Sequence, residues 1–157
     1  MLTEICQYLH NWFNRKPNGE LYPQYAGKVT ILNNVITFED REYVLVNGQY
    51  FRIMGSLFND GVHKYGTDVL ADEEFTGAVW SMAVPPDVVS LASEIATWQA
   101  EYGAVGSAAM SPYNSESFGG YSYSKQSGGS SGGAGSLSPG TWQSVYAARL
   151  SPWRKLP

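Results

Sequence analysis

The segment from Gly27 to Met54 constrains the fold most, because its residues favour strands over helices. It is rich in β-branched and aromatic side chains. Asn33-Asn34 and Asn47-Gly48 divide it, and both dipeptides suit two-residue hairpin turns with positive φ. The pattern predicts an antiparallel β-meander with strands at residues 29–32, 35–38, 43–46 and 49–54, within an inserted β subdomain of residues 26–70.

Three helices are predicted outside this β subdomain. Residues 2–13, 87–102 and 141–150 carry apolar side chains at helical spacing. The second of these has Pro85-Pro86 at its start and Gly103 after its end, which is typical of helix boundaries. We therefore expect an N-terminal helix, a long central helix and a C-terminal helix.

The stretch between the meander and the long helix has weaker signals. Residues 55–70 contain turn residues and indicate either a loop or a short extra hairpin. Residues 73–84 follow Asp72 and begin with two acidic residues, which suit a helix N-terminus. We predict a short helix there, although Gly77 is unfavourable within a helix.

Residues 104–140 are short of aliphatic side chains and rich in Gly, Ser and Tyr. This composition indicates a flexible loop. A loop of this length within a compact domain is usually functional or becomes ordered at an interface. Four of its aromatic residues have few aliphatic partners, so we predict that they contact another protein, and the alternative is that the loop packs on itself: Tyr113, Phe118, Tyr121 and Tyr123.

The length of 157 residues is that of one domain with a single main core, so residues 1–157 are predicted to form a single domain. The predicted fold class is α+β. A small helical bundle of the three helices forms the body, with the antiparallel β-meander inserted. The long Gly/Ser-rich loop at 104–140 precedes the C-terminal helix and tail at 141–157.

The charge and cysteine content exclude some classes of function. Lys and Arg number 10 against 14 Asp and Glu, a net charge of −4, which argues against a protein that grips DNA through its phosphates. Cys6 is the only cysteine, so an intrachain disulfide and a cysteine-based zinc site are excluded. We find no signal-peptide pattern and no apolar run of about 20 residues, and therefore expect folding in the cytoplasm and no membrane partner.

The candidate chemical sites are weak. Cys6 and His10 lie four residues apart on the first predicted helix, but Cys6 falls on its apolar stripe, so a core position is expected. Five carboxylates do not have the spacing of a calcium loop: Asp60, Asp68, Asp72, Glu73 and Glu74. The glycine-rich stretches contain no phosphate-binding motif, and the serines of residues 104–140 lack both the setting of a nucleophilic GxSxG serine and a credible base. We predict no enzyme activity, no cofactor and no metal.

The C-terminal half resembles a known family. The run Ser115-Glu116-Ser117-Phe118-Gly119-Gly120-Tyr121-Ser122 is followed, after a spacer, by a helix that ends in Ala147-Ala148-Arg149-Leu150-Ser151-Pro152-Trp153-Arg154-Lys155. The order and spacing of these residues are similar to those of head-tail connector (adaptor, or head-completion) proteins of tailed bacteriophages. The N-terminal half departs from the simple helical bundle of that family.

The resemblance implies a structural subunit of the virion neck, made in the cytoplasm of the host bacterium. It implies a ring of identical copies, a dodecamer, that docks on the portal protein and extends the DNA channel toward the tail. The tail-side partner would be another neck protein, a stopper or tail terminator, and DNA would pass through without specific binding. The serine-rich stretch and the closing helix are expected beside residues 87–102.

We therefore predict docking rather than catalysis as the function. The predicted interface with the portal or a neighbouring subunit consists of Tyr113, Glu116, Phe118, Tyr121, Tyr123, Arg149, Trp153, Arg154 and Lys155. Trp and Arg are favoured as interface anchors. The alternative is a tail- or capsid-associated carbohydrate-binding module that uses aromatic residues of the meander, namely Tyr43, Tyr50 and Phe51.

Overall fold

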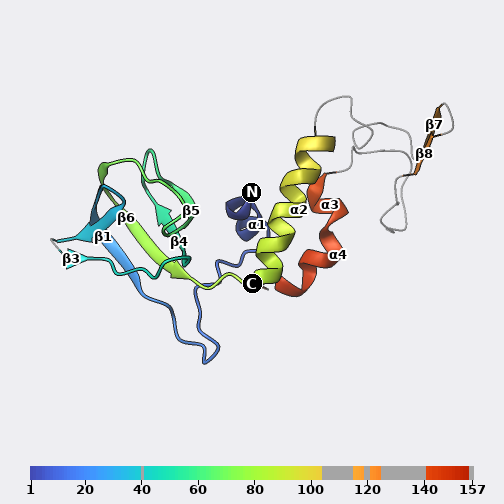
Figure 1. The fold of residues 1–157 in the computed structure, drawn as a ribbon. Coiled ribbons are helices and arrows are strands. Elements are labelled where there is room, and N and C mark those ends of the chain that lie inside the picture. The colour runs from blue at the N-terminus through green and yellow to red at the C-terminus, as the bar shows by residue number, and fades with distance from the viewer. Residues whose placement is uncertain (40, 104–114, 119–120, 125–140, 156–157) are drawn as a thin grey trace. The chain divides into compact units, whose positions relative to one another are not determined.

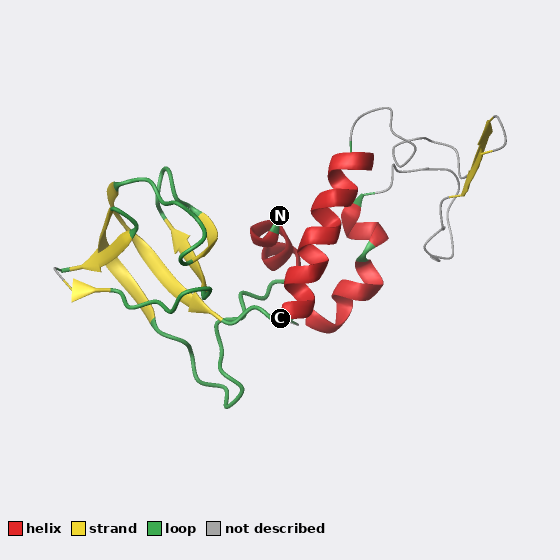
Figure 2. Ribbon diagram, viewed as in Figure 1, coloured by secondary structure: helices red, strands yellow, loops and turns green. Residues whose placement is uncertain are grey.

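The computed structural model describes residues 1–39, 41–103, 115–118, 121–124 and 141–155 (Figure 1). The chain divides into two compact units. We call Leu2–Pro86 the sheet unit, and Asp87–Pro157 together with Met1 the C-terminal unit. Figure 2 shows the long strands in the first and the longer helix in the second.

The sheet unit contains a six-stranded antiparallel sheet with the order β3-β2-β1-β6-β4-β5. Its strands are β1 (Gln24–Leu32), β2 (Val35–Phe38), β3 (Arg41–Glu42), β4 (Tyr50–Met54), β5 (Gly61–Lys64) and β6 (Glu73–Met82). The two central strands, β1 and β6, are far apart in the sequence and pair from Gln24 with Trp80 to Ile31 with Glu73. Non-local pairing therefore organises this unit.

The first predicted hairpin is confirmed. β1 and β2 pair with Leu32 opposite Val35, so Asn33 and Asn34 form the two-residue turn. Their φ angles are 52° and 64°, both positive. Asparagine tolerates this left-handed conformation better than most residues, which is why the dipeptide specifies the turn.

The second half of the predicted meander is only partly confirmed: the strand predicted at 49–54 is observed as β4, but the strand at 43–46 and the hairpin that it would form are wrong. Asn47-Gly48 does form a turn, with φ of 84° at Gly48, but residues 43–46 are not a strand of the sheet. β4 pairs instead with β5 and β6. The cause is that β6 lies between β1 and β4, and this position is set by a pairing that local turn sequences do not encode. Residues 55–70 contain one strand, β5, which pairs with β4 and not with a second strand of the same segment; the rest of the segment is loop.

The predicted helix over residues 73–84 is also wrong, because this segment is β6. Its Gly77 lies opposite Gly27 of β1. A Cβ atom at Gly77 would lie 2.0 Å from the backbone oxygen of Met54. Gly77 therefore permits close packing between β6 and its neighbour β4. Glycine is also unfavourable within a helix, because it loses more conformational entropy there than other residues do.

One apolar cluster stabilises the sheet unit. It contains nine buried residues from β1, β2, β4, β6 and two connecting segments: Val29, Ile31, Ile36, Phe38, Leu45, Phe51, Ile53, Leu70 and Val79. Alternate residues of a strand share a face, so these positions make one face of the sheet apolar. Leu45 and Leu70 bring the connecting segments onto the same core.

The N-terminal helix α1 (Leu2–Tyr8) is shorter than the predicted 2–13. The NH of Asn11 donates to the Cys6 carbonyl and the NH of His10 to the Gln7 carbonyl, while His10 has a φ of 51°. These are the two hydrogen bonds of a Schellman motif, which ends a helix with a left-handed residue. The helix therefore ends at a backbone cap and does not reach Phe13.

The predicted helical bundle is wrong as the body of the fold. The sheet is the larger structure, and α2 (Pro86–Tyr102) is the only sizeable helix in the described part of the chain. The predicted C-terminal helix is divided into α3 (Trp142–Val145), α4 (Ala147–Leu150) and the 3-10 turn η2 (Ser151–Trp153). None of the described helices has the length and apolar character needed to cross a membrane.

Candidate functional site

The closing segment of the chain lies along α2. Arg149 on α4 forms a two-pronged ion pair with Glu94 on α2, with Nη1 to Oε2 at 2.5 Å and Nη2 to Oε1 at 3.1 Å. The hydrogen bond from Arg149 lowers the pKa of Glu94. This pair joins two parts of the chain 55 residues apart, so Arg149 has a partner within its own subunit.

Aromatic and aliphatic packing supports the same arrangement. The rings of Trp98 on α2 and Tyr146 lie edge to face, with centroids 6.4 Å apart. Leu150 is fully buried, and Trp142 is nearly so. A capping box between Thr141 and Ser144 fixes the start of α3. The resemblance implied a closing helix beside residues 87–102, and these contacts have that arrangement.

The serine-rich motif contains a separate two-stranded sheet, formed by β7 (Ser115–Phe118) and β8 (Tyr121–Ser124). Its register pairs position 116 with 123 and position 118 with 121. Directly opposed residues share a face of an antiparallel ladder. Four of the predicted interface positions, those of Glu116, Phe118, Tyr121 and Tyr123, therefore belong to one face, and the serines belong to the other.

The remaining predicted interface residues lie at the end of the chain, except Tyr113, which falls outside the described residues. Trp153 ends η2 and is half-buried. Arg154 and Lys155 follow it and are exposed. Arg154 has φ of −70° and ψ of 126°, so the backbone becomes extended directly after Trp153. The structure thus leaves the predicted residues in two places, the β7-β8 ladder and the closing segment.

A polar cluster that the sequence did not suggest holds one end of the six-stranded sheet. Glu73, at the start of β6, accepts hydrogen bonds from Ser56 Oγ at 2.5 Å, from the NH groups of Leu57 and Phe58 at 2.8 and 3.4 Å, and from Asn59 Nδ2 at 3.1 Å. The Ser56 bond leads the causes that lower the pKa of Glu73. One carboxylate therefore fixes the 56–59 loop.

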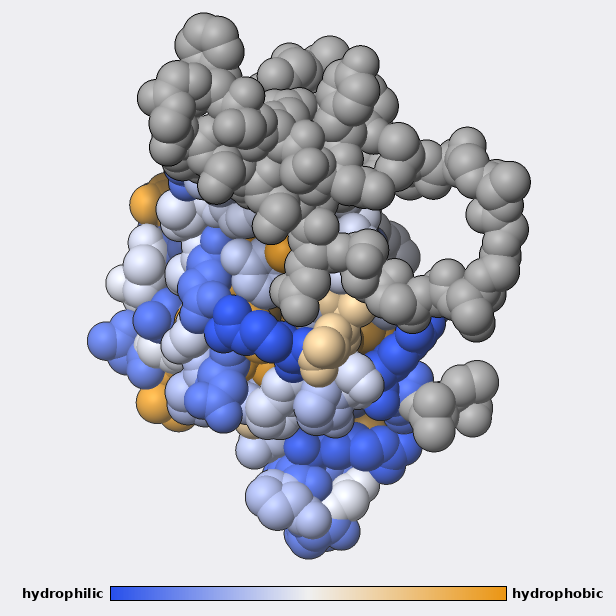
Figure 3. All heavy atoms as spheres, turned by 90° about the vertical axis from the view of Figure 1, so that its right-hand side faces the viewer, coloured by the Kyte–Doolittle hydropathy of each residue, from blue (hydrophilic) through white to orange (hydrophobic). Residues whose placement is uncertain are grey.

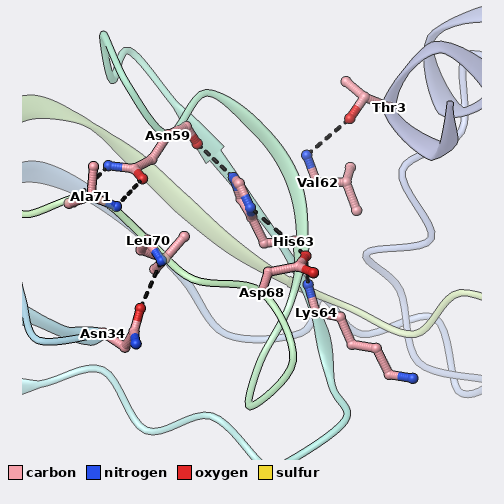
Figure 4. A network of polar contacts seen from close by, with 9 residues as sticks. All are labelled: Thr3, Asn34, Asn59, Val62, His63, Lys64, Asp68, Leu70 and Ala71. Atoms are coloured by element: carbon pink, nitrogen blue, oxygen red, sulfur yellow. Dashed lines mark hydrogen bonds and ion pairs between the residues drawn. The ribbon is translucent and has the colours of Figure 1, made fainter.

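Asparagine side chains fix the neighbouring loops in the same way (Figure 4). Asn59 donates to the Ala71 carbonyl at 3.0 Å and accepts from the Ala71 NH at 2.8 Å. Asn34 Oδ1 accepts from the Leu70 NH at 2.7 Å. The NH of the adjacent Asn33 donates to Asp72 at 2.7 Å. The β1-β2 turn, the 56–59 loop and residues 70–72 are thereby tied together.

His63 on β5 lies between two parts of this loop system (Figure 4). Its Nε2 is 2.7 Å from the Asn59 carbonyl, an acceptor, so Nε2 carries the proton of the neutral ring. Its Nδ1 is 3.9 Å from Asp68 Oδ2, and the same oxygen accepts from the Lys64 NH at 2.7 Å. Asp68 thus closes the turn after β5.

A pocket of about 270 Å³ opens beside these loops, and we call it the Val69 pocket. Its lining comes from the β1-β2 turn, β4 and the segment after β5: Asn33, Asn34, Val35, Phe51, Tyr65, Gly66, Thr67, Asp68, Val69 and Leu70. Two of the lining residues, Val35 and Val69, are 37% and 85% exposed. Exposed apolar side chains around a pocket are typical of contact surfaces.

The residues that the sequence offered for thiol chemistry or metal binding are described by their surroundings. Burial raises the pKa of the Cys6 thiol to about 12, while His10 is exposed at the left-handed end of α1. Glu73 holds a loop, and Glu74 pairs with Lys28 at 3.1 Å. Among the described residues no group of three or more His, Cys, Asp or Glu side chains is arranged to hold a metal ion.

Most of the aromatic residues named in the alternative carbohydrate-binding hypothesis make contacts within the sheet unit. Phe51 is 1% exposed and belongs to the core cluster. The Tyr43 hydroxyl lies 2.5 Å from the Pro23 carbonyl and 2.7 Å from Ser81 Oγ. Tyr50 is half-buried beside Lys64. Two of the three residues are therefore used inside the unit.

Figure 3 shows one face of the molecule, on which the described residues are mainly hydrophilic and apolar residues occupy small separate spots.

Comparison with known proteins adds no relative: no protein-family model, no curated protein and no solved structure matches this chain.

Proposed function

We propose that this chain is a structural head-tail adaptor of a tailed bacteriophage. Its copies form a ring that docks on the portal protein in the virion neck and continues the DNA channel toward a tail-side neck protein. It performs no catalysis in this account. The C-terminal unit makes the docking contacts, and the sheet unit provides the scaffold.

The observation that carries the proposal is the register of the β7-β8 ladder. It assigns Glu116, Phe118, Tyr121 and Tyr123 to a single face. An isolated two-stranded sheet is only marginally stable in water. A ladder with three aromatic residues and one carboxylate on one face is therefore expected to gain stability by packing that face against a partner.

The closing segment gives a second line of support. Residues of the family-like motif, Arg149 among them, lie against α2 through the ion pair with Glu94. Trp153, Arg154 and Lys155 follow at the end of this supported segment. A rigid base with an aromatic and basic end is a suitable anchor, because preorganisation reduces the entropy lost on docking.

The net charge of −4 agrees with the same function. A channel through which DNA moves must not bind the phosphate backbone tightly, and an acidic subunit meets this requirement. The charge supports the proposal together with the two contact regions.

Light scattering of the purified protein, alone and mixed with the portal protein of the same phage, tests the proposal. We expect a stable complex with the portal whose mass corresponds to a ring of copies. The double variant W153A/R154A should lose this complex, whereas V44K, at an exposed valine of the sheet unit, should retain it. A chain that remains monomeric and ignores the portal would refute the proposed function, and unchanged assembly of W153A/R154A would refute the role of the tail.

A further inference from the structure

We propose that the β7-β8 ladder joins copies of this chain edge to edge, with β8 of one copy adding to β7 of the next as an antiparallel strand. The hairpins of successive copies then form one continuous sheet around the ring. The inference rests on the proposed function, because a closed ring supplies the repeated head-to-tail contact. It names the partner of the ladder, a second copy, and the mode of contact.

The ladder has edges at which another strand can add. Among the described residues it consists of β7 and β8 alone, so no third described strand pairs with either outer edge. Such an edge presents backbone NH and carbonyl groups to a further strand. Two strands alone are marginally stable, and additional strands stabilise them. Strand addition therefore stabilises the ladder and joins two chains in one step.

The edges of the six-stranded sheet, in contrast, are protected. At the β5 edge, the Val62 NH donates to Thr3 Oγ1 of α1 at 3.0 Å (Figure 4). At the opposite edge, β3 has only two residues, Arg41 and Glu42, and both are charged. Covering elements, short edge strands and charged residues are the usual means of preventing edge-to-edge association. The strand sequences SESF and YSYS have one charged residue, Glu116, and no proline or lysine, so the ladder has little of this protection.

The register of the ladder suits a second copy as the added strand. Within the hairpin, position 116 pairs with 123 and position 118 with 121. Copies related by a rotation present β8 and β7 to each other in antiparallel orientation, so the same register can continue across the joint. Each Glu116 position then lies between two Tyr123 positions, and successive Glu116 positions are about 10 Å apart, two strand spacings. The repeat separates the carboxylates and continues the aromatic cross-strand pairs, both of which favour the contact.

The alternation of ladder hydrogen bonds identifies the backbone groups at the joint. Two residues separate Phe118 from its partner Tyr121, and a connection of this length is closed by a hydrogen bond between the flanking residues. Bonded and non-bonded pairs alternate along an antiparallel ladder. The NH groups of Ser117 and Ser122 therefore point away from the hairpin. Across the joint, 123 and 116 become a non-bonded pair with Cα atoms about 4.5 Å apart, which a disulfide can span.

Cysteine cross-linking between two differently tagged full-length chains, with and without the portal protein, tests this contact. One chain carries E116C and the other Y123C, so a mixed disulfide joins β7 of one copy to β8 of another. The control pair is E116C with S122C, because position 122 belongs to the opposite face of the ladder. The native Cys6 is fully buried, so it does not compete in a glutathione redox buffer.

We expect the E116C–Y123C disulfide to form at least about tenfold faster than the control disulfide, because the joint raises the effective concentration of the second thiol. It should also exceed the disulfides between two E116C chains or two Y123C chains. Equal rates for the mixed pair and the control, or a predominance of disulfides between like chains, would overturn the inference.

A proline variant separates strand addition from an exchange of strands between hairpins. S122P in the Y123C chain removes an outward NH and leaves the hydrogen bonds of the hairpin intact, so it should abolish the mixed disulfide. S122A keeps this NH and should retain the disulfide. A mixed disulfide that persists in S122P would mean exchange of strands and would overturn strand addition.

The failure of this contact and the failure of the proposed function give different results. Light scattering of the same mixtures measures portal binding independently of the disulfide. A portal-bound ring without the mixed disulfide would overturn the strand addition alone. A mixed disulfide in a chain that ignores the portal would overturn the adaptor function and leave the contact between copies in place.

Discussion

The two units of this protein are stabilised in different ways. The sheet unit has a continuous cluster of nine buried apolar residues, and its loops are fixed by hydrogen bonds to Glu73, Asn59 and Asn34. The described part of the C-terminal unit has one helix of 17 residues, two helices of four residues each and an exposed ion pair between Arg149 and Glu94. Short helices depend on packing for their stability.

This difference indicates a division of labour. Regions that change on binding are drawn from the less stable parts of a protein, while strands in a core keep their structure. We therefore expect the sheet unit to keep its structure during assembly. The C-terminal unit, which contains both regions of predicted interface residues, should become more ordered at its contacts.

The largest expected effect comes from G77A, which tests the rigidity of the sheet. A Cβ atom at this position would lie 2.0 Å from the Met54 carbonyl oxygen, so β4 and β6 must separate. We expect a loss of about 4 kcal/mol or more in the free energy of unfolding, measured by urea denaturation. The exposed neighbour variant T76A is the control, and a G77A protein as stable as T76A would contradict the close packing.

The variant L150A tests whether the units differ in stability. Leu150 is fully buried on α4, and its truncation should cost about 3 kcal/mol through lost burial and a cavity. Hydrogen exchange should show the loss in α2, α3 and α4. Equal loss of protection in β1 and β6 would show that the two units unfold together and would break the comparison.

The pH dependence of stability tests the cluster around Glu73. Its pKa is lowered from the ordinary value of 4.5, so the charged form favours the folded state. The stabilisation is present above pH 4.5 and is lost as the pH falls through the folded pKa. E73Q should therefore be less stable than the wild type at neutral pH, and the difference should shrink in acid. A difference that is constant with pH would contradict this role.

The smallest expected effect belongs to the Arg149–Glu94 pair. Both side chains are about half exposed, and exposed ion pairs contribute little to stability. A double-mutant cycle with R149A and E94A should give a weak favourable coupling that disappears in high salt. A coupling that salt does not change would mean that the pair is shielded from solvent and that the C-terminal unit is more rigid than proposed.

The elements that were predicted correctly are specified by residues adjacent in the sequence. Asn33-Asn34 specified its hairpin through the backbone preference of asparagine, and the prolines and Gly103 marked the ends of α2. β6 was missed because its acidic start resembled a helix N-terminus, while its actual partners, β1 and β4, lie elsewhere in the chain. The β-branched and aromatic residues of this segment, Phe75, Thr76, Val79 and Trp80, were the available signal for a strand.

The candidate site shows the same limit. The composition of residues 104–140 and the basic end of the chain could be seen in the sequence, and so could be predicted as contact regions. The Val69 pocket could not, because its lining joins β4, the β1-β2 turn and the segment after β5. The role of Glu73 was hidden for the same reason, since its donors lie 14 to 17 residues earlier.

Hydrogen exchange of the full-length protein, alone and bound to the portal, tests the division of labour most directly. We predict that protection rises in residues 115–124 and 149–155 on binding, while β1 and β6 exchange slowly in both states. Unchanged exchange in these two C-terminal regions, together with new protection along β1 and β6, would contradict the account.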